Sequence, residues 1–274
     1  MYAGIDIGTT YTKCILLDPQ GKVAARSIER TSVDHKGLAE YMLDHCLKER
    51  GKSKKNLAGV ALTGFGRRIV NSVFSIPVTS YPDVLCICKG VWWHHKGNGI
   101  AEDEENESLL ILDIGGEKWK FIHSENGNPK DFLSNDMCAV GTGKFIDYVA
   151  KSLKISIDDI TARALKSQKV CEIKQTCGIF VEAEIISKLS QGQQAEDLFA
   201  GLFRHMFECI QLKSHGFKQQ SEILYLIGGV SQNIFLQQLF LHEYKKVILP
   251  QEAQFIGAIG ASLFLNKNQK TIGE

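Results

Sequence analysis

Two cysteines stand where a thiol could bind a metal or act as a nucleophile. Cys138 and Cys177 each precede a segment whose apolar residues recur at helical spacing, namely Phe145, Val149 and Leu153 after the first and Phe180, Ile185, Ile186 and Leu189 after the second. A helix N-terminus carries unpaired N–H groups and roughly half a positive charge, which stabilises a thiolate or any anion bound there. We therefore expect both cysteines at helix N-termini. The alternative for each is a small buried hydrophobic residue, the usual state of a free cysteine.

Two turns with the sequence Asp-Ile-Gly have the residues to bind a phosphate group and Mg²⁺. Asp6-Ile7-Gly8 is followed by Thr9 and Thr10, and Asp113-Ile114-Gly115-Gly116 repeats the pattern 107 residues later. Each turn lies between a buried strand and a second strand, which predicts two related lobes that face each other. Glycine lets backbone N–H groups approach phosphate oxygens, threonine hydroxyls add donors, and the carboxylate can hold Mg²⁺ or its waters. The alternative is a pair of ordinary hairpin turns.

A third glycine element lies late in the chain. Gly228-Gly229 stands between a predicted strand and a helix start, where backbone can approach a nucleoside closely. Its alternative is a helix cap made of glycines. Because the three elements occur together and in this order, nucleotide binding explains them better than three independent turns.

The composition of the chain limits the classes of partner that the protein can bind. Its 274 residues carry 32 Lys and Arg against 31 Asp and Glu, a net charge of +1 that would not recruit nucleic acid or an anionic membrane. No secretion signal opens the chain, and no apolar run approaches the ~18 residues of a membrane span. We expect a soluble, cytoplasmic protein. In such a protein its eight cysteines are core residues, reactive thiols or metal ligands, and not disulfides.

The apolar patterns predict an α/β protein of two lobes. Strands are predicted within 2–27 as an antiparallel meander, and at 57–62, 108–114, 118–123, 221–227 and 247–250. Helices are predicted at 36–50, 83–93, 156–166, 178–190, 194–214 and 253–265. The acidic segment 102–107 lacks periodicity, so we place the lobe boundary there, with lobes 1–106 and 107–274. For the last helix, about 253–266, packing back on the first lobe is an open alternative.

Two further groups of residues remain open in role. Cys86, Cys88 and Cys171 are candidate additional metal or redox residues, with packing or simple exposure as the alternative. Trp92-Trp93-His94-His95 is predicted to be a patch at the lobe surface or an interface.

The order of these motifs resembles a known superfamily. Asp-Ile-Gly-Thr-Thr, Asp-Ile-Gly-Gly and the late Gly-Gly-Val are similar to the two-lobed acetate kinase, sugar kinase, Hsp70 and actin superfamily, whose mixed sheets have a ribonuclease H-like, actin-like fold. Within it, the chain resembles the activator ATPases of 2-hydroxyacyl-CoA dehydratases and the ATPase subunits of benzoyl-CoA reductase. The segments that carry this narrower resemblance are Asn135 to Phe145, Thr176 to Ser187, Gly228 to Asn233, Thr63 to Arg67 and Gly257 to Ala261.

This resemblance implies an ATP-dependent, oxygen-sensitive electron donor of low potential. Cys138 and Cys177 would each supply a ligand to one [4Fe–4S] cluster shared across a two-fold homodimer. An electron would come from a ferredoxin or flavodoxin and pass to a partner iron–sulfur dehydratase or reductase, which handles the acyl-CoA substrate.

The resemblance also implies roles for the residues of the nucleotide site. Asp6 and Asp113 would serve Mg²⁺ and the attacking water. The phosphates of ATP or ADP would lie against Gly8, Thr9, Thr10, Lys13, Gly115 and Gly116. The nucleoside would lie against Gly228, Gly229, Gln232 and Asn233, and the joint that senses the nucleotide would be Gly141, Thr142 and Gly143.

Two departures from the family pattern leave rival functions open. The family usually has Gln-Asp where this chain has Glu117-Lys118, and often has His where it has Ile87. Glu117 could orient the attacking water, whereas Lys118 cannot replace a carboxylate, so the departure leaves open whether hydrolysis is slow or differently arranged. One rival is a sugar kinase of the same fold with Asp136 as general base. The other is a nucleotide-bound redox regulator whose cysteines report oxidation.

Overall fold

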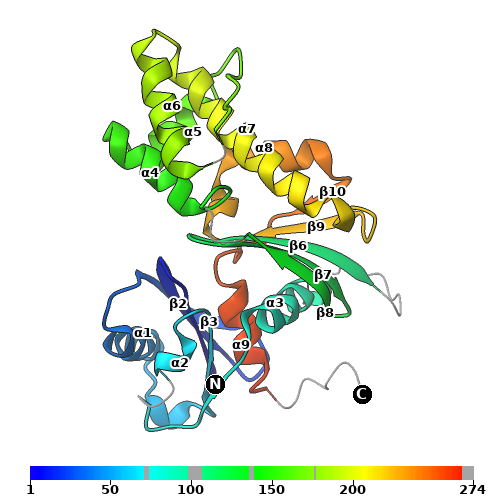
Figure 1. Cartoon of the computed structure of the whole chain (residues 1–274). Coiled ribbons are helices and arrows are strands. Elements are labelled where there is room, and N and C mark those ends of the chain that lie inside the picture. The colour runs from blue at the N-terminus through cyan, green and yellow to red at the C-terminus, as the bar shows by residue number, and fades with distance from the viewer. Residues whose placement is uncertain (71–73, 98–106, 136–138, 176, 267–274) are drawn as a thin grey trace. The chain divides into compact units, whose positions relative to one another are not determined.

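The chain forms two compact units. The computed structural model describes residues 1–70, 74–97, 107–135, 139–175 and 177–266 (Figure 1). Unit 1 comprises Met1–Ser108, Ser124–Asp131 and Pro250–Glu274, and unit 2 comprises Leu109–His123 and Phe132–Leu249. Within the described ranges, no helix is long and apolar enough to cross a bilayer.

The secondary structure alternates between strands and helices along the chain. The strands are β1 (Tyr2–Ile7), β2 (Tyr11–Leu17), β3 (Val23–Arg30), β4 (Val60–Thr63), β5 (Val78–Ser80), β6 (Ser108–Ile114), β7 (Trp119–Glu125), β8 (Asn128–Ser134), β9 (Ile223–Ile227) and β10 (Lys246–Ile248). The α-helices are α1 (His35–Glu49), α2 (Arg67–Val70), α3 (Asp83–Gly97), α4 (Gly143–Leu153), α5 (Ile157–Ala164), α6 (Gly178–Ser190), α7 (Ala195–Ser214), α8 (Ile234–Glu243) and α9 (Ile256–Leu263). Short 3₁₀ turns are η1 (Lys54–Asn56), η2 (His215–Phe217) and η3 (Gly229–Gln232).

The sheet of unit 1 has the order β3-β2-β1-β4-β5. Strands β1, β2 and β3 pair antiparallel, which confirms the predicted meander, and β4 and β5 join in parallel. The pairing places Asp6 opposite Lys13 on β2 and opposite Thr63 on β4. Asp6, the polar residue near the end of β1, therefore lies between β2 and the C-terminal end of β4.

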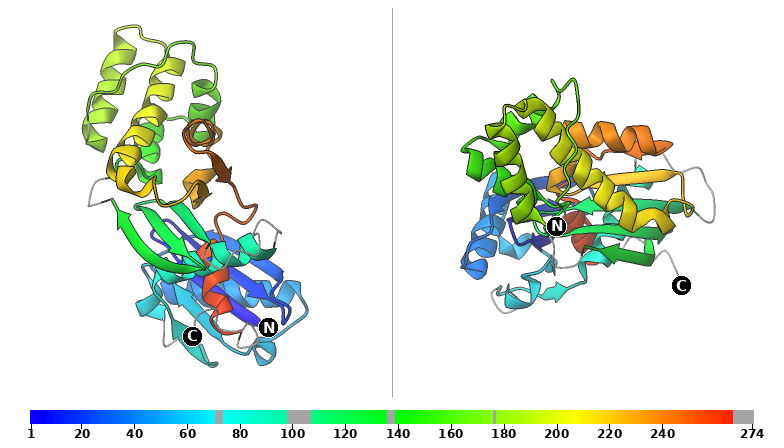
Figure 2. Two further views of the ribbon diagram at one scale, coloured as in Figure 1. Left: turned by 90° about the vertical axis from the view of Figure 1, so that its right-hand side faces the viewer. Right: turned by 45° about the horizontal axis from the view of Figure 1, so that its top comes forward.

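Alternating side chains cover both faces of this sheet, because successive residues of a strand point to opposite sides. Ile5, Ile7 and Leu16 pack in one buried cluster with Met42 and Leu43 of α1. The intervening residues of β2 belong to a second cluster, formed by Ile15, Leu17, Ala258, Ile259 and Leu263, the last three from α9. Figures 1 and 2 show α1 on one side of the sheet and α3 with α9 on the other.

Helix α9 lies against α3 and β1 with backbone in close contact. A Cβ placed on Gly260 would lie 1.7 Å from the carbonyl oxygen of Cys86, and one on Gly4 would lie 1.9 Å from that of Ala258. Only glycine fits at either position. Burial raises the pKa of Cys86 and of Cys88 to about 12, which keeps both thiols neutral in this core.

The aromatic and histidine run at the end of α3 is part of this packing, so the prediction that it forms a patch on the lobe surface is wrong. Trp92 and His95 are buried, and the Trp93 indole donates to the Gly21 carbonyl at 3.1 Å. His95 forms an ion pair with Glu107. The run joins α3 to the turn after β2 and to the chain before β6.

The sheet of unit 2 has the order β10-β9-β6-β7-β8. Helices α4 to α8 lie on one side of it (Figures 1 and 2). Leu110, Leu112 and Ile114 of β6 point into the large core that these helices complete. Asp113 has the opposite parity on the strand, so it points to the other face.

The two sheets repeat one topology. In each sheet, the central strand that leads into Asp-Ile-Gly lies between the next strand in the sequence and a parallel strand that comes later in the chain. The next strand is β2 for β1 and β7 for β6, and the parallel strand is β4 for β1 and β9 for β6. The sequence predicted both turns and most elements. It missed β5, β8 and the body of α8, since β5 is only three residues long and β8 is largely exposed and polar.

Candidate functional site

The first Asp-Ile-Gly turn presents a carboxylate, an ammonium group and a hydroxyl together. Lys13 Nζ lies 3.4 Å from Asp6 Oδ2 across the β1–β2 pair. Thr31 donates its hydroxyl to the Gly8 carbonyl at 2.8 Å and so supports the turn from behind. Thr10 Oγ1 is buried, yet it has no hydrogen-bond partner in the described part of the chain. Such an orphaned hydroxyl suits a turn that receives a phosphate oxygen.

The second turn has the same construction in unit 2. Lys120 Nζ lies 3.6 Å from Asp113 Oδ2, and the Gly115 N–H donates to the Lys118 carbonyl at 2.8 Å. Lys120 follows Asp113 by the same seven residues that separate Lys13 from Asp6. Sequence reasoning missed Lys120, although an alignment of the two halves on their Asp-Ile-Gly turns would have found it.

A glycine of left-handed conformation stands beside each carboxylate. Gly64 follows β4 with φ +83°, and a Cβ there would lie 2.4 Å from Asp6 Oδ1. Gly228 follows β9 with φ +86°, and a Cβ there would lie 2.5 Å from Asp113 Oδ1. Both positions require glycine for conformation and for space. Gly64 had not been expected in the site, and the duplication of the fold identifies it.

The second turn is bonded directly to the start of α4. The Gly143 N–H donates to the Gly115 carbonyl at 3.0 Å, and the Lys144 N–H donates to the Gly116 carbonyl at 2.7 Å. The Lys144 ammonium forms an ion pair with Glu117. The first turn of the helix is therefore fastened to the predicted phosphate turn by backbone and side chain.

The residues before α4 support the same turn. The Asn135 side chain accepts the Trp119 N–H at 2.8 Å and donates to the Glu117 carbonyl at 3.2 Å. Gly141 has φ +86° and lies against the Trp119 indole, where a Cβ would be 2.9 Å from Nε1. Thr142 occupies the N-cap position of α4, and its hydroxyl donates backward to the Ala139 carbonyl at 2.5 Å. Cys138 and Asp136 lie outside the described residues.

Cys177 is the N-cap residue of α6, as predicted. Its carbonyl accepts the Val181 N–H at 2.9 Å, which closes the first turn of the helix. The next residue, Gly178, lies against Phe145 of α4, since a Cβ there would be 3.3 Å from the Phe145 ring. Ile179 and Phe180 are 70% and 60% exposed, so the partly exposed Cys177 thiol lies next to an exposed apolar surface of α6.

The late glycine element opens η3 and then α8. Ser231 donates its hydroxyl to the Gly228 carbonyl at 2.6 Å. Asn233 is buried, caps α8 by accepting the Leu236 N–H at 3.0 Å, and donates to the Thr161 hydroxyl at 2.7 Å. Gly229 and Gln232 are exposed. The Asn233 side chain thus has structural partners, while its neighbours present accessible backbone and amide groups.

The predicted residues therefore fall into two sets. Unit 1 brings together Asp6, Gly8, Thr9, Thr10 and Lys13 at one turn. Unit 2 brings Asp113, Gly115, Gly116 and Glu117 to Gly141, Thr142, Gly143 and Gly228. Asp at a strand end, paired glycine turns and a nearby helix start are the parts of a nucleotide-binding ATPase fold, here present twice.

Comparison with known proteins defines the family. The repeated topology is that of actin-like ATPases. The chain belongs to the BadF/BadG/BcrA/BcrD ATPase family, whose model matches residues 3–264. It is 31% identical over 266 residues to the (R)-2-hydroxyglutaryl-CoA dehydratase activating ATPase of Acidaminococcus fermentans, covering 96% of each chain.

Solved structures of such activators have the same fold. The crystal structure of component A of the A. fermentans (R)-2-hydroxyglutaryl-CoA dehydratase has a TM-score of 0.86 and 28% identity, covering 97% of this chain and 98% of that one. The 2-hydroxyisocaproyl-CoA dehydratase activator from Clostridium difficile, with bound ADPNP, has a TM-score of 0.83 and 27% identity, covering 98% and 95%.

The glycine beside Asp113 gives a direct test of this geometry. We expect Gly228→Ala to lower the free energy of unfolding by about 2 kcal/mol or more, because alanine is strained at positive φ and its methyl group would overlap the carboxylate. Gly229→Ala is the matched control, since a Cβ at that position meets open space. Urea unfolding followed by circular dichroism measures both. Equal stability of the two variants would contradict the conclusion that only glycine fits beside Asp113 at position 228.

Proposed function

We propose that the chain is an ATP-dependent electron donor that activates a partner iron–sulfur enzyme of the 2-hydroxyacyl-CoA dehydratase type. ATP hydrolysis is coupled to the transfer, because the free energy of a phosphoanhydride can drive an electron to a potential that a ferredoxin or flavodoxin alone would not reach. The protein is cytoplasmic in this proposal. The names of the related activators support the partner class.

One observation carries the proposal: backbone hydrogen bonds join the predicted phosphate turn to α4, and the Phe145 side chain of α4 packs against the start of the cysteine helix. Gly115 and Gly116 accept the first N–H groups of α4, and Phe145, in that same helical turn, lies against Gly178. Gly178 follows Cys177 directly. A displacement of the turn by a nucleotide would therefore move α4 as a rigid element against the start of α6.

The nucleotide residues have defined tasks in this proposal. Each Asp-Ile-Gly turn, at Asp6 in unit 1 and at Asp113 in unit 2, is a phosphate-binding element, with Thr9, Thr10 and Lys13 of the first turn on phosphate oxygens. The orphaned Thr10 hydroxyl supports this assignment. Asp6 and Asp113 offer the hard carboxylate oxygens that Mg²⁺ prefers, and Glu117 orients the attacking water. Gly228, Gly229 and Gln232 border the nucleoside, and Asn233 holds the helix behind them.

The cysteine helix suits a thiolate-bound cluster in chemistry and position. Its thiol is soft, partly exposed and placed at unpaired helix N–H groups that favour negative charge. Across the described residues, no three His, Cys, Asp or Glu gather into a complete metal site. In this proposal a [4Fe–4S] cluster would take Cys138 and Cys177 from each of two chains, and it would supply one electron at low potential.

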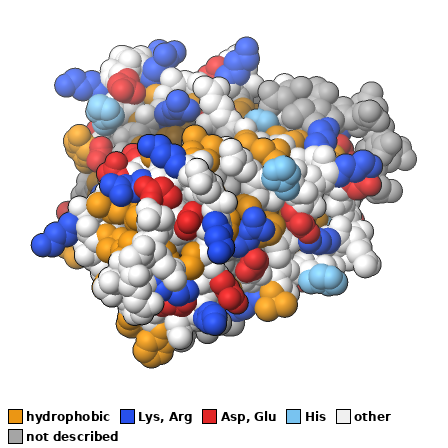
Figure 3. Space-filling view, turned by 90° about the horizontal axis from the view of Figure 1, so that it is seen from above, with side chains coloured by type: hydrophobic (Ala, Val, Ile, Leu, Met, Phe, Trp, Pro, Cys, Tyr) orange, Lys and Arg blue, Asp and Glu red, His pale blue; other side chains and the backbone are white. Residues whose placement is uncertain are grey.

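An exposed apolar surface supports the two-fold dimer. Ile179 and Phe180, at the Cys177 end of α6, and Ile186, about two turns further along the helix, are exposed. Figure 3 looks from above on the side where Figure 1 shows α6, and apolar side chains lie there among charged ones. A second copy would cover this surface and exclude water from the thiols.

The cysteines give the test of the proposal. Protein purified without oxygen should contain about four irons per homodimer. Cys138→Ser and Cys177→Ser should each lose this iron and still bind ATP, whereas the control Cys171→Ser should keep both properties. Iron analysis, visible absorption and nucleotide titration measure these outcomes. A wild-type protein that stays colourless after anaerobic reconstitution, or a Cys177→Ser protein with full iron, contradicts the proposal; sugar-stimulated ATP turnover would favour the kinase.

Glu117 is tested separately, because its ion pair with Lys144 offers a structural explanation for any effect. Glu117→Ala should lower the rate of ATP hydrolysis by about a hundredfold through loss of the water-orienting carboxylate, with ATP affinity unchanged. Lys144→Met breaks the same ion pair and keeps the carboxylate, so it should slow hydrolysis much less. Phosphate release and ATP titration measure the two effects. Equal rates in both variants would show that Glu117 acts only through Lys144.

A further inference from the structure

The segment 167–175, which we call the approach segment, leads to Thr176 and Cys177 and is held along its length. At its start, Asp197 accepts the Ser167 hydroxyl at 2.7 Å and the N–H groups of Gln168 at 3.2 Å and Lys169 at 3.0 Å. These bonds, together with a coulombic contribution from Lys169, keep the pKa of Asp197 below its usual value. The segment therefore begins at a fixed position beside α7.

The middle of the approach segment packs against the backbone of α7. The Cys171 N–H donates to the Asp197 carbonyl at 3.0 Å. A Cβ on Gly201 would lie only 2.0 Å from the Cys171 carbonyl oxygen, so that position has room for glycine alone. Ile173 is buried in the core of unit 2. The backbone at residue 171 is thus fixed against α7, and the Cys171 side chain packs partly buried against the same core.

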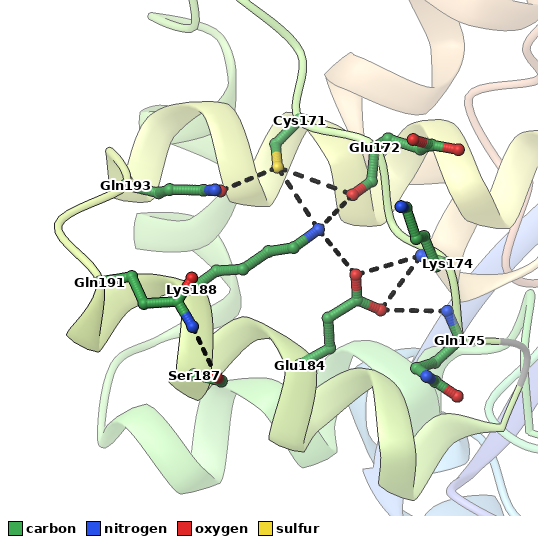
Figure 4. A network of polar contacts seen from close by, with 9 residues as sticks. All are labelled: Cys171, Glu172, Lys174, Gln175, Glu184, Ser187, Lys188, Gln191 and Gln193. Carbon is green, nitrogen blue, oxygen red and sulfur yellow. Dashed lines mark hydrogen bonds and ion pairs between the residues drawn. The ribbon is translucent and has the colours of Figure 1, made fainter.

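The end of the approach segment is held by one side chain of α6, Glu184 (Figure 4). Glu184 Oε2 accepts the N–H groups of Lys174 at 3.1 Å and Gln175 at 3.0 Å. Its other oxygen, Oε1, lies 2.6 Å from Lys188 Nζ, which donates in turn to the Glu172 carbonyl at 2.5 Å. Burial raises the pKa of Glu184, but these bonds outweigh burial and hold it below its usual value.

We propose that Glu184 is a positioning residue that fixes the backbone immediately before Thr176 and thereby the placement of Cys177 at the start of α6. The chain is held on both sides of Cys177. On its C-terminal side, Gly178 packs against Phe145 and the Val181 N–H bonds to the Cys177 carbonyl; on its N-terminal side, Glu184 accepts the Gln175 N–H. Lys188 neutralises the carboxylate, so the clamp adds little repulsion toward an anionic group at Cys177. The role toward a cluster rests on the proposed function, whereas the clamp itself does not.

The test compares three variants under reducing, oxygen-free conditions. Glu184→Leu removes both acceptors, and Glu184→Gln keeps one oxygen that can accept both N–H groups, as Oε2 does. Glu182→Leu is the matched control, because Glu182 lies on the same helix but contacts Ser152 of α4. Hydrogen exchange at the Lys174 and Gln175 amides is measured in the cluster-free protein. The electron paramagnetic resonance spectrum and midpoint potential are measured after cluster reconstitution.

We expect amide exchange at Lys174 and Gln175 to be about tenfold faster in Glu184→Leu, since hydrogen bonds to a charged acceptor are lost. Glu184→Gln should restore most of the protection, and Glu182→Leu should leave it unchanged. The spectrum and potential should shift in Glu184→Leu alone. Equal exchange in wild type and Glu184→Leu, or equal effects of Glu184→Leu and Glu182→Leu, would overturn the proposal.

A measurement on the wild-type chain keeps the proposal testable if Glu184→Leu does not fold. The Lys174 and Gln175 amides should then exchange about tenfold more slowly than in an unstructured peptide, and an absence of protection would overturn the clamp. If the wild-type protein takes up no iron, the proposed function fails, while exchange at these two amides still decides whether Glu184 holds the approach segment.

Discussion

Two backbone hydrogen bonds connect the parts of unit 2 that matter for function. The carbonyls of Gly115 and Gly116 accept the first N–H groups of α4, so the Asp-Ile-Gly-Gly turn satisfies donors that a helix start would otherwise leave unpaired. The first turn of α4 therefore cannot move unless these hydrogen bonds break or the Asp-Ile-Gly-Gly turn moves with it. Because Phe145 in that turn lies against Gly178, the position of the Asp-Ile-Gly-Gly turn and the position of the cysteine helix are mechanically linked.

The repeated fold explains why each turn is built as it is. In both units a strand ends in aspartate, a lysine seven residues later pairs with it, and a glycine after the neighbouring parallel strand leaves room for the carboxylate. A side chain at Gly64 or Gly228 would displace that carboxylate. The same steric constraint therefore preserves two acidic groups of matching geometry, which is the chemistry that a magnesium nucleotide needs.

Local patterns predicted a large part of this arrangement. Glycine turns between apolar runs identified both central strands, and the periodicity after Cys177 identified α6 and its N-cap. Long-range packing was not predictable in the same way. Trp92 and His95 are buried because α3 packs against the turn after β7, where a Cβ on Gly127 would lie 2.8 Å from Trp92, and against Glu107, which pairs with His95. Glu184 resembles an ordinary solvated helix residue, and its role depends on backbone N–H groups that a sequence does not place.

The most direct test of the mechanical link is amide hydrogen exchange in the two nucleotide states. Exchange at Lys144 and Val181 is compared with MgADP and with a non-hydrolysable ATP analogue, in wild type and in Phe145→Leu. The link predicts that both amides respond to the nucleotide in wild type, and that Phe145→Leu keeps the response at Lys144 and loses it at Val181. An unchanged Val181 amide in wild type, or a full response in Phe145→Leu, would contradict it.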